Sequence, residues 1–201
     1  MRNHRQESSL EIVPYPHPTL RHKSKPIRRV DAELRKIVGE MFELMYEAKG
    51  IGLAANQVDL PIRLFIVNLT SDPKEGEEMV FINPVVSKQK GSEEREEGCL
   101  SLPGLYAQVM RPKTIHLSAY NLAGEAIEGD LDEMMARVVP HENDHLDGIM
   151  FTDRLSTTGT MDVKEELEEF EIDFQSRQRI EQIPSNEEIA TRLIEWETKY
   201  C

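Results

Sequence analysis

The segment His141-Glu142-Asn143-Asp144-His145 limits what this chain can fold into more than any other part of the sequence. On an α-helix, residues four positions apart share a face, so His141 and His145 can give two imidazole nitrogens to one metal ion. Glu142, beside the first histidine, can then act as a general base on a metal-bound water. The same pattern also arises by chance, so it needs support from other segments.

Pro140 stands directly before this pattern. Within a helix, proline removes one backbone hydrogen bond and clashes with the carbonyl four residues earlier, here that of Ala136, at a cost of about 3 kcal/mol unless the helix kinks. A kink at this place lies before the histidines and leaves them on one continuous turn. We therefore expect a kink or a weakened hydrogen bond at Ala136, with His141 and His145 still sharing one face.

A metal site also needs a third protein ligand, and the sequence offers two kinds. In proteases with this histidine pattern the third ligand lies downstream, and Glu165 or Glu166 is the candidate here. The other candidate is Cys99, in the loop-like segment 96–104. The chain has two cysteines, Cys99 and Cys201, which excludes a disulfide framework and fits a reducing compartment. Cys99 is therefore either a buried free thiol or a chemical group.

The segment GIGLAANQ, residues 50–57, matches a dinucleotide-binding fingerprint only superficially. A predicted helix precedes it where that fingerprint needs a strand, and no helix opens before Pro61. Its two glycines instead allow a ligand to approach the backbone closely, and the amide of Gln57 can donate a hydrogen bond. The segment therefore predicts a ligand contact without nucleotide binding.

Apolar spacing predicts where the helices and strands lie. Residues 31–48 place apolar side chains three and four positions apart, which predicts a helix with Asp31 as its N-cap and Gly50 just past its end. Strands are predicted at residues 62–69, 79–86, 106–112 and 114–130, the last as a hairpin turning near Asn121–Gly124, and a second helix at residues 131–147. Strands and helices are segregated along the chain, so we predict an α+β fold with antiparallel sheet.

The end of the chain is acidic and helical in composition. An apolar stripe marks one helix: Val163, Leu167 and Phe170. Pro184 should break the helix, and Ser185 and Glu188 form a predicted capping box at the start of another. We predict a catalytic domain at residues 1–160 and an acidic helical extension at residues 161–201 that packs on the same domain.

Charge and hydropathy exclude several classes of protein. The formal net charge is −13, so a general nucleic-acid binder, which needs a basic surface, is not expected. No apolar run approaches the roughly 18–20 residues needed to span a membrane. Residues 1–18 lack the apolar stretch of a secretory signal. We expect a cytoplasmic protein that binds neither DNA nor a membrane.

Three segments, taken in order, resemble the peptide deformylases: GIGLAANQ at 50–57, EGCLS at 97–101 and HENDHLDG at 141–148. Residues 15–27 also look like the N-terminal arm of that family. The resemblance implies an α+β fold in which antiparallel sheets enclose the helix that carries HExxH, followed by a C-terminal helix. It further implies a metallo-hydrolase that removes the N-formyl group from the N-terminal formylmethionine of newly made peptides and releases formate.

The resemblance also implies roles for single residues and a cofactor. The positions that match metal ligands are Cys99, His141 and His145. The positions that match catalytic groups are Glu142, Gln57 and the backbone N–H of Leu100. The positions that match contacts to the substrate backbone are Ile51, Gly52 and Gly98. The implied cofactor is one divalent metal ion per chain, iron(II), with zinc also accommodated. Two other functional classes remain open. One is an enzyme, a zinc endopeptidase with an acidic third ligand, and the other is a family-like protein that only binds peptides.

The methionine side chain of the substrate should provide specificity, because the formyl group is small. Met134 and Val138 lie seven and three residues before His141, on the face of the predicted helix that carries the ligands. Together with Ile51 they are candidates for an apolar pocket, although ordinary core packing explains them as well. Arg111 is a candidate ion-pair partner for Glu97, which would brace the cysteine loop.

The sequence departs from the family pattern in several places. Pro140 stands where glutamine is usual, and Tyr106 where many members place an arginine that touches the peptide. The tail is acidic and long, whereas some members dock on the ribosome through a basic C-terminal helix. The partners implied are N-formylmethionyl peptides and the ribosome exit region, the latter not through a basic tail.

Overall fold

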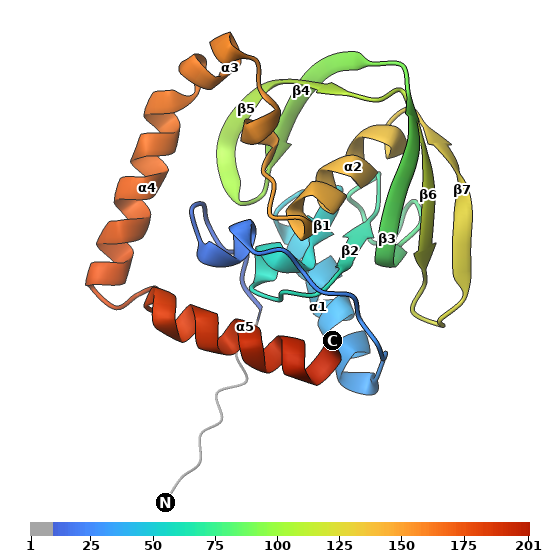
Figure 1. Ribbon diagram of the computed structural model, residues 1–201, viewed down its shortest axis with the longest axis horizontal. Coiled ribbons are helices and arrows are strands. Elements are labelled where there is room, and N and C mark those ends of the chain that lie inside the picture. Colours follow the sequence, from blue (N-terminus) through green and yellow to red (C-terminus); the bar gives the residue numbers. More distant parts are fainter. Residues whose placement is uncertain (1–9) are drawn as a thin grey trace, which may run out of the picture.

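The computed structural model describes residues 10–201 (Figure 1). Residues 1–9 lie outside the described residues. They belong to the predicted 1–160 domain and to the N-terminal segment that was expected to lack a signal. The strands are β1 (Gly52–Ala54), β2 (Leu64–Val67), β3 (Met79–Lys90), β4 (Glu93–Cys99), β5 (Leu102–Arg111), β6 (Thr114–Tyr120) and β7 (Ala126–Asp132). They form a five-stranded antiparallel sheet in the order β1-β2-β3-β6-β7 and a separate two-stranded sheet, β4–β5.

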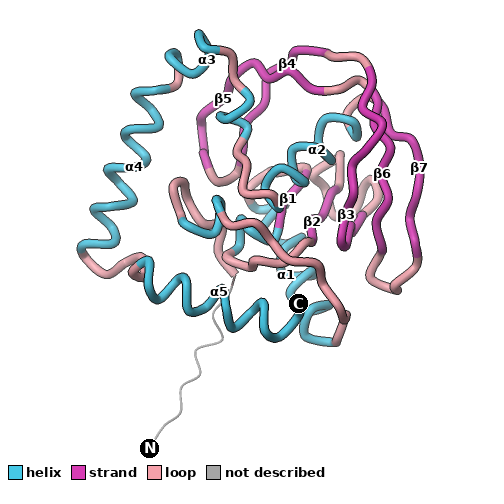
Figure 2. Tube along the Cα trace, in the orientation of Figure 1, coloured by secondary structure: helices cyan, strands magenta, loops and turns pink. Residues whose placement is uncertain are grey.

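The helices are α1 (Ala32–Glu47), α2 (Met135–Leu146), α3 (Thr157–Asp162), α4 (Lys164–Arg179) and α5 (Asn186–Tyr200), with 3₁₀ turns η1 (Pro18–Arg21), η2 (Ala55–Val58) and η3 (Phe151–Arg154). Helix α2 lies inside the curve formed by the larger sheet and the β4–β5 hairpin (Figure 1). Figure 2 shows the same arrangement, with the strands wrapped around α2 and the last helices along the outside. The predicted α+β fold, with antiparallel sheets around a central helix and a C-terminal helix, is confirmed.

Apolar clusters lie on both sides of the larger sheet, and one of them fixes the position of α2. One cluster joins α1 to β1 and β2 and includes Leu34, Met41 and Leu64. A second joins α2 to the sheet and includes Val139 and Phe65. Each fully buried aliphatic or aromatic side chain contributes about 1.5–3 kcal/mol, so α2 is held in place by packing along most of its length.

Helix α1 begins as predicted and ends differently. The side chain of Asp31 accepts a hydrogen bond from the backbone N–H of Leu34 at 2.9 Å, which confirms the N-cap. At the other end Lys49, not Gly50, takes the left-handed conformation, with φ 57°. The N–H of Lys49 donates to the Tyr46 carbonyl and that of Gly50 to the Met45 carbonyl, which is the Schellman arrangement of a helix end.

Gly50 has a different role from the one predicted, because the space beside it is filled. A Cβ at this position would lie 2.7 Å from Cδ1 of Leu100, the residue that follows the cysteine of the second motif. Glycine therefore lets the end of α1 approach the turn after β4, and so helps to bring the first and second motifs together.

The hairpin between β6 and β7 forms as predicted, turning at Asn121–Gly124, where Gly124 has φ 79°. The second helix starts at Met135 rather than residue 131, because β7 runs on to Asp132. Strand β4 was not predicted. Its sequence, EEREEGC, is rich in glutamate, which strands disfavour, and pairing with β5 overrides that local preference.

Helix α2 runs as one element through Pro140. Proline has no N–H, so the Ala136 carbonyl receives no hydrogen bond from it. Both residues are buried. The missing bond lies one turn before the histidines, as expected, whereas a kink stays a prediction.

The two ends of the described chain are fastened together. Pro184 lies between α4 and α5, and the capping box of Ser185 and Glu188 is confirmed. The backbone N–H of Arg28 donates to the Tyr200 carbonyl at 2.8 Å, and Lys25 pairs with Glu197 at 2.7 Å. Helix α5 thus holds the N-terminal arm, residues 10–31. No helix among the described residues is long and apolar enough to cross a membrane.

Candidate metal centre

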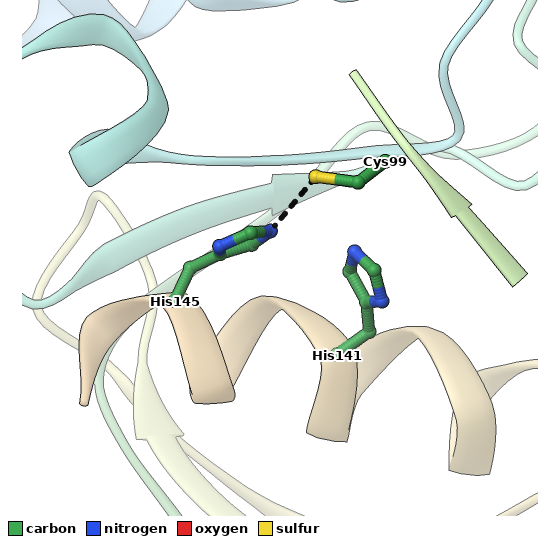
Figure 3. Close-up of side chains that lie close together, drawn as sticks. All are labelled: Cys99, His141 and His145. Atoms are coloured by element: carbon green, nitrogen blue, oxygen red, sulfur yellow. Dashed lines mark hydrogen bonds between the residues drawn. The ribbon is translucent and has the colours of Figure 1, made fainter. Parts of the chain in front are cut away.

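Two separate elements bring three potential metal ligands together (Figure 3). Cys99 ends strand β4, while His141 and His145 lie one turn apart on α2. One ligand atom from each of the three lies within 4.8 Å of the others, and the Cys99 Sγ is 3.4 Å from the His145 Nε2. The structure therefore brings together the cysteine and both histidines named from the sequence.

The donor set fits a catalytic transition-metal ion. Metal–sulfur bonds of about 2.3 Å and metal–nitrogen bonds of about 2.0–2.1 Å place tetrahedral ligands roughly 3.3–3.6 Å apart, which agrees with the distance between Cys99 and His145. Three protein ligands leave one position open for water or substrate. Glu165 and Glu166 lie exposed in the first turn of α4 and are not part of this group, so the structure does not support them as third ligands.

The environment of the histidines favours the neutral, metal-binding form of His145. Burial lowers its pKa well below the ordinary value, and the charges of His141 and Arg111 lower it further. His141 is oriented by Glu97, whose Oε2 lies 3.1 Å from its Nδ1. Since the carboxylate accepts, Nδ1 keeps its proton, and Nε2 is the nitrogen that would bind a metal, with loss of any proton it carries. This is the usual outer-shell support of a metal-binding histidine.

Glu142 is 4% exposed, beside the three ligands, and its Oε2 has no hydrogen-bond partner among residues 10–201. Burial raises its pKa to about 7, against the opposing charges of His141 and Arg111. A carboxyl group that titrates near neutral pH can both accept and return a proton at working pH. A buried, unpaired carboxylate oxygen in this place indicates a group that acts on a substrate or a water.

Gly52, predicted to contact the substrate backbone, packs against this carboxylate. A Cβ here would lie 2.4 Å from the Glu142 Oε1 and must displace it. We expect Gly52→Ala to lower kcat by about 100-fold, since a misplacement of about 1 Å costs that much, while the fold and the bound metal are retained. Gly129→Ala, where a Cβ meets nothing within 4 Å, is the matched control. Equal kcat in both variants would contradict this role of Gly52.

Gln57 is 1% exposed and its amide is fixed at both ends. Its Oε1 accepts from the Ala54 N–H at 2.9 Å, so its Nε2 points to the metal centre, 3.3 Å from the Cys99 Sγ and 3.3 Å from the Ser101 Oγ. Leu100 follows Cys99 in the turn between β4 and β5. The two groups expected to donate hydrogen bonds to the substrate carbonyl therefore both lie next to the cysteine.

The remaining substrate candidates differ in their surroundings. Ile51 and Val138 share one apolar cluster with α2 and the sheet. Gly98 lies under Tyr106, because a Cβ there would come 2.6 Å from the ring. Met134 is 39% exposed, directly before α2, and belongs to none of the three apolar clusters. The structure thus groups Ile51 with Val138 but not with Met134.

A buried network of charges lies behind the ligands. The expected pair of Arg111 and Glu97 is confirmed, with the Arg111 Nε donating to the Glu97 Oε1 at 3.0 Å. Burial alone would raise the pKa of Glu97, but hydrogen bonds from His141 and Arg111 lower it to about 2. Arg111 also donates to Asp144 at 2.5 Å, and Arg137 to Glu97 at 2.6 Å.

Sequence reasoning missed Arg137, Asp144 and Ser101. Arg137 lies four residues before His141, so helix periodicity places it on the face of the ligands and could have identified it. Asp144 has no comparable signal, because its buried partner Arg111 lies on a different element, 33 residues earlier in the chain.

Comparison with known proteins agrees with this geometry. Residues 9–161 match the family described as polypeptide deformylase. The chain is 52% identical to the peptide deformylase of Rhodopirellula baltica over 95% of each chain. It is 39% identical to the chloroplastic/mitochondrial peptide deformylase 1B of Arabidopsis thaliana, over 92% of this chain and 67% of that protein. A crystal structure of a plant peptide deformylase superposes with a TM-score of 0.83 and 39% identity, over 90% of this chain and 97% of the other.

Proposed function

Since the chain belongs to the polypeptide deformylase family, and is therefore a metal-dependent hydrolase that removes the N-formyl group from the N-terminal formylmethionine of newly made peptides, we propose a role for each residue of its metal centre. Cys99, His141 and His145 bind one divalent metal ion. When bound, the metal supplies Lewis acidity that lowers the pKa of a water and polarises the formyl oxygen. The proximity of the three ligand atoms supports this assignment.

Glu142 moves the protons of the reaction. Its carboxylate accepts a proton from the attacking water and returns it to the leaving amine, so that formate and a peptide with a free amino group are released. Support comes from its burial, its unpartnered Oε2 and its pKa of about 7. This unpartnered carboxylate beside three metal ligands is the observation that carries the proposal.

Gln57 and the backbone N–H of Leu100 stabilise the negative charge that develops on the formyl oxygen. Each such donor commonly contributes about 3–4 kcal/mol to transition-state stability. The Ala54 N–H holds the Gln57 amide in place before substrate binds, which reduces the reorganisation needed during the reaction. Ile51, Gly52 and Gly98 contact the substrate backbone, and Val138 with Ile51 forms the apolar wall nearest the methionine.

Iron(II) is the proposed native metal, and it makes the enzyme sensitive to oxygen. A thiolate ligand next to ferrous iron invites oxidation of both the metal and Cys99. We expect the iron form to lose activity during exposure to air. We expect the zinc form to keep its metal under the same exposure. Formate release from formyl-Met-Ala-Ser, with metal content measured on the same sample before and after exposure, checks this.

The same assay tests the function itself. Apo protein reconstituted with ferrous iron without oxygen should release formate from formyl-Met-Ala-Ser. If iron-loaded protein of measured metal content released none, the proposed roles of the centre would fail. No observation favours the endopeptidase or the peptide-binding alternative, because the acidic third ligands lie elsewhere and the catalytic positions are filled.

We further propose that residues 1–160 form the catalytic domain and residues 161–201 an extension packed on it. Support comes from Phe174 of α4 and Ile189 of α5, both buried. We place the enzyme in the cytoplasm, which the free Cys99 and Cys201 support. Contact with the ribosome exit region does not require a basic tail, and the acidic α4 argues against docking through that helix.

A further inference from the structure

The metal centre takes its ligands from two elements, a hairpin and a helix. Among the described residues, no strand pairing joins the hairpin to the sheet on which the helix packs. Cys99 comes from the β4–β5 hairpin, which is a separate two-stranded sheet, and the histidines come from α2, which packs on the five-stranded sheet. A metal ion tolerates errors of only about 0.2 Å in its ligand distances. Some contact must therefore fix the hairpin against the helix.

Arg137 makes such a contact with both strands of the hairpin, in addition to the Arg111–Asp144 pair, which joins only β5 to α2. From α2, its Nη1 donates to the Glu97 Oε1 at 2.6 Å and to the Val109 carbonyl at 3.1 Å, and its Nη2 donates to the Glu93 carbonyl at 2.8 Å. Glu97 and Glu93 belong to β4, and Val109 to β5. The guanidinium thus bonds to the strand that ends in Cys99 and to its partner.

The position of Arg137 links the two halves of the centre directly. It lies one helical turn before His141, and its carboxylate partner Glu97 lies two residues before Cys99. The same Glu97 also accepts from His141. One guanidinium therefore connects the histidine side to the cysteine side through a single carboxylate.

Stability alone does not explain this arginine. Arg137 and Glu97 are each 7% exposed. Replacing a buried ion pair with apolar residues of similar volume is often neutral or stabilising, because removing two charges from water costs several kcal/mol per ion. A positional role for the network accounts for its presence.

We propose that Arg137 is a positioning residue, which sets the distance between Cys99 and the two histidines and so determines how tightly the centre binds its metal. This inference rests on the proposed metal ligands and adds a residue that touches neither metal nor substrate. Its rigid, forked guanidinium suits the task, since it bonds a carboxylate and two carbonyls at once, which the point charge of lysine does not.

The test compares Arg137→Met with Arg63→Met. Arg63 is the matched control because its guanidinium also bonds to α2, at the Asp147 Oδ1 (2.8 Å) and the Asn143 Oδ1 (3.3 Å), but from the β2 side and without touching the hairpin. Zn²⁺ affinity is measured by chelator competition, and the unfolding of each apo protein is measured in parallel. We expect Arg137→Met to weaken Zn²⁺ binding by about 10–100-fold and Arg63→Met by less than about threefold.

Cobalt(II) gives a readout that a merely structural arginine would not change. The thiolate-to-Co²⁺ absorption band should weaken or shift in Arg137→Met and stay unchanged in Arg63→Met. Unchanged affinity and spectrum in Arg137→Met, or equal losses in both variants, would overturn the proposal. A wild-type Co²⁺ complex without a thiolate band would instead contradict the metal ligands themselves.

Arg137→Lys covers the case in which the methionine variant does not fold. Lysine keeps the charge near Glu97 but cannot bond both carbonyls. We therefore expect a Zn²⁺ affinity lower than that of the wild type and higher than that of Arg137→Met. Wild-type affinity in a folded Arg137→Lys protein would show that the fork is not needed and would overturn the proposal.

Discussion

Glu142→Gln should abolish formate release while the protein keeps its metal. The amide has nearly the same shape as the carboxylate but cannot accept a proton from water at neutral pH. General acid–base catalysis commonly contributes 10²–10⁴-fold, and Glu142 would serve in both directions, so we expect kcat to fall by at least about 1,000-fold. The buried, unpartnered Oε2 of this residue is the structural reason to expect so large an effect.

The control for this variant is Asp147→Asn, which makes the same change of charge at the end of the same helix. Asp147 pairs with Arg63, away from the ligands, and should keep nearly full activity. Metal content and the pH dependence of kcat/KM are measured for each protein. A Glu142→Gln enzyme with bound metal and near wild-type turnover would show that another group carries the proton.

Cys99→Ser should lose both tight metal binding and activity. A serine hydroxyl stays protonated at neutral pH and is a poor ligand for a borderline-soft ion, whereas the thiolate binds strongly. The remaining ligands, His141 and His145, hold the metal too weakly for it to survive dialysis. We expect metal content near zero after dialysis and formate release at least about 1,000-fold below wild type, comparable with the loss of a whole catalytic unit.

Cys201→Ser is the matched control, because it changes the other cysteine of the chain at its C-terminal end. It should keep its metal and its activity. The pair of variants also decides between the two enzyme classes. An endopeptidase with Glu165 or Glu166 as third ligand would keep its metal in Cys99→Ser, so retention of metal and of peptide-bond cleavage would support that class.

Part of the chemistry of the site could be predicted from the sequence. HENDH defines two histidines and a glutamate by helix periodicity, whereas the roles of Cys99 in EGCLS and Gln57 in GIGLAANQ were implied only by the resemblance to a known family. The pairing of Glu97 with Arg111 was also expected from the sequence, and the structure confirms it, although the hairpin that joins the two residues was not predicted.

The parts that could not be predicted depend on contacts between distant segments. Strand β4 has a strand-disfavouring sequence and exists because β5 pairs with it. Gly50 was expected to end α1, but Lys49 takes the left-handed position and Gly50 is needed for the approach of Leu100. Met134 has the right helical spacing for a pocket and lies exposed at the start of α2, so its contact with the substrate stays a prediction.

The contacts that hold the N-terminal arm on α5 affect the order in which parts of the enzyme fold. The arm donates from Val13 to the Gln57 carbonyl and from Tyr15 to the Ser101 carbonyl, so it supports the segments around the cysteine. Its own anchor, Glu197, lies 172 residues after Lys25. Closing so long a loop is entropically costly and slow compared with local contacts. During synthesis, the arm is therefore fastened to α5 only after Glu197 has left the ribosome, and a shorter nascent chain lacks this support for the segments around Cys99.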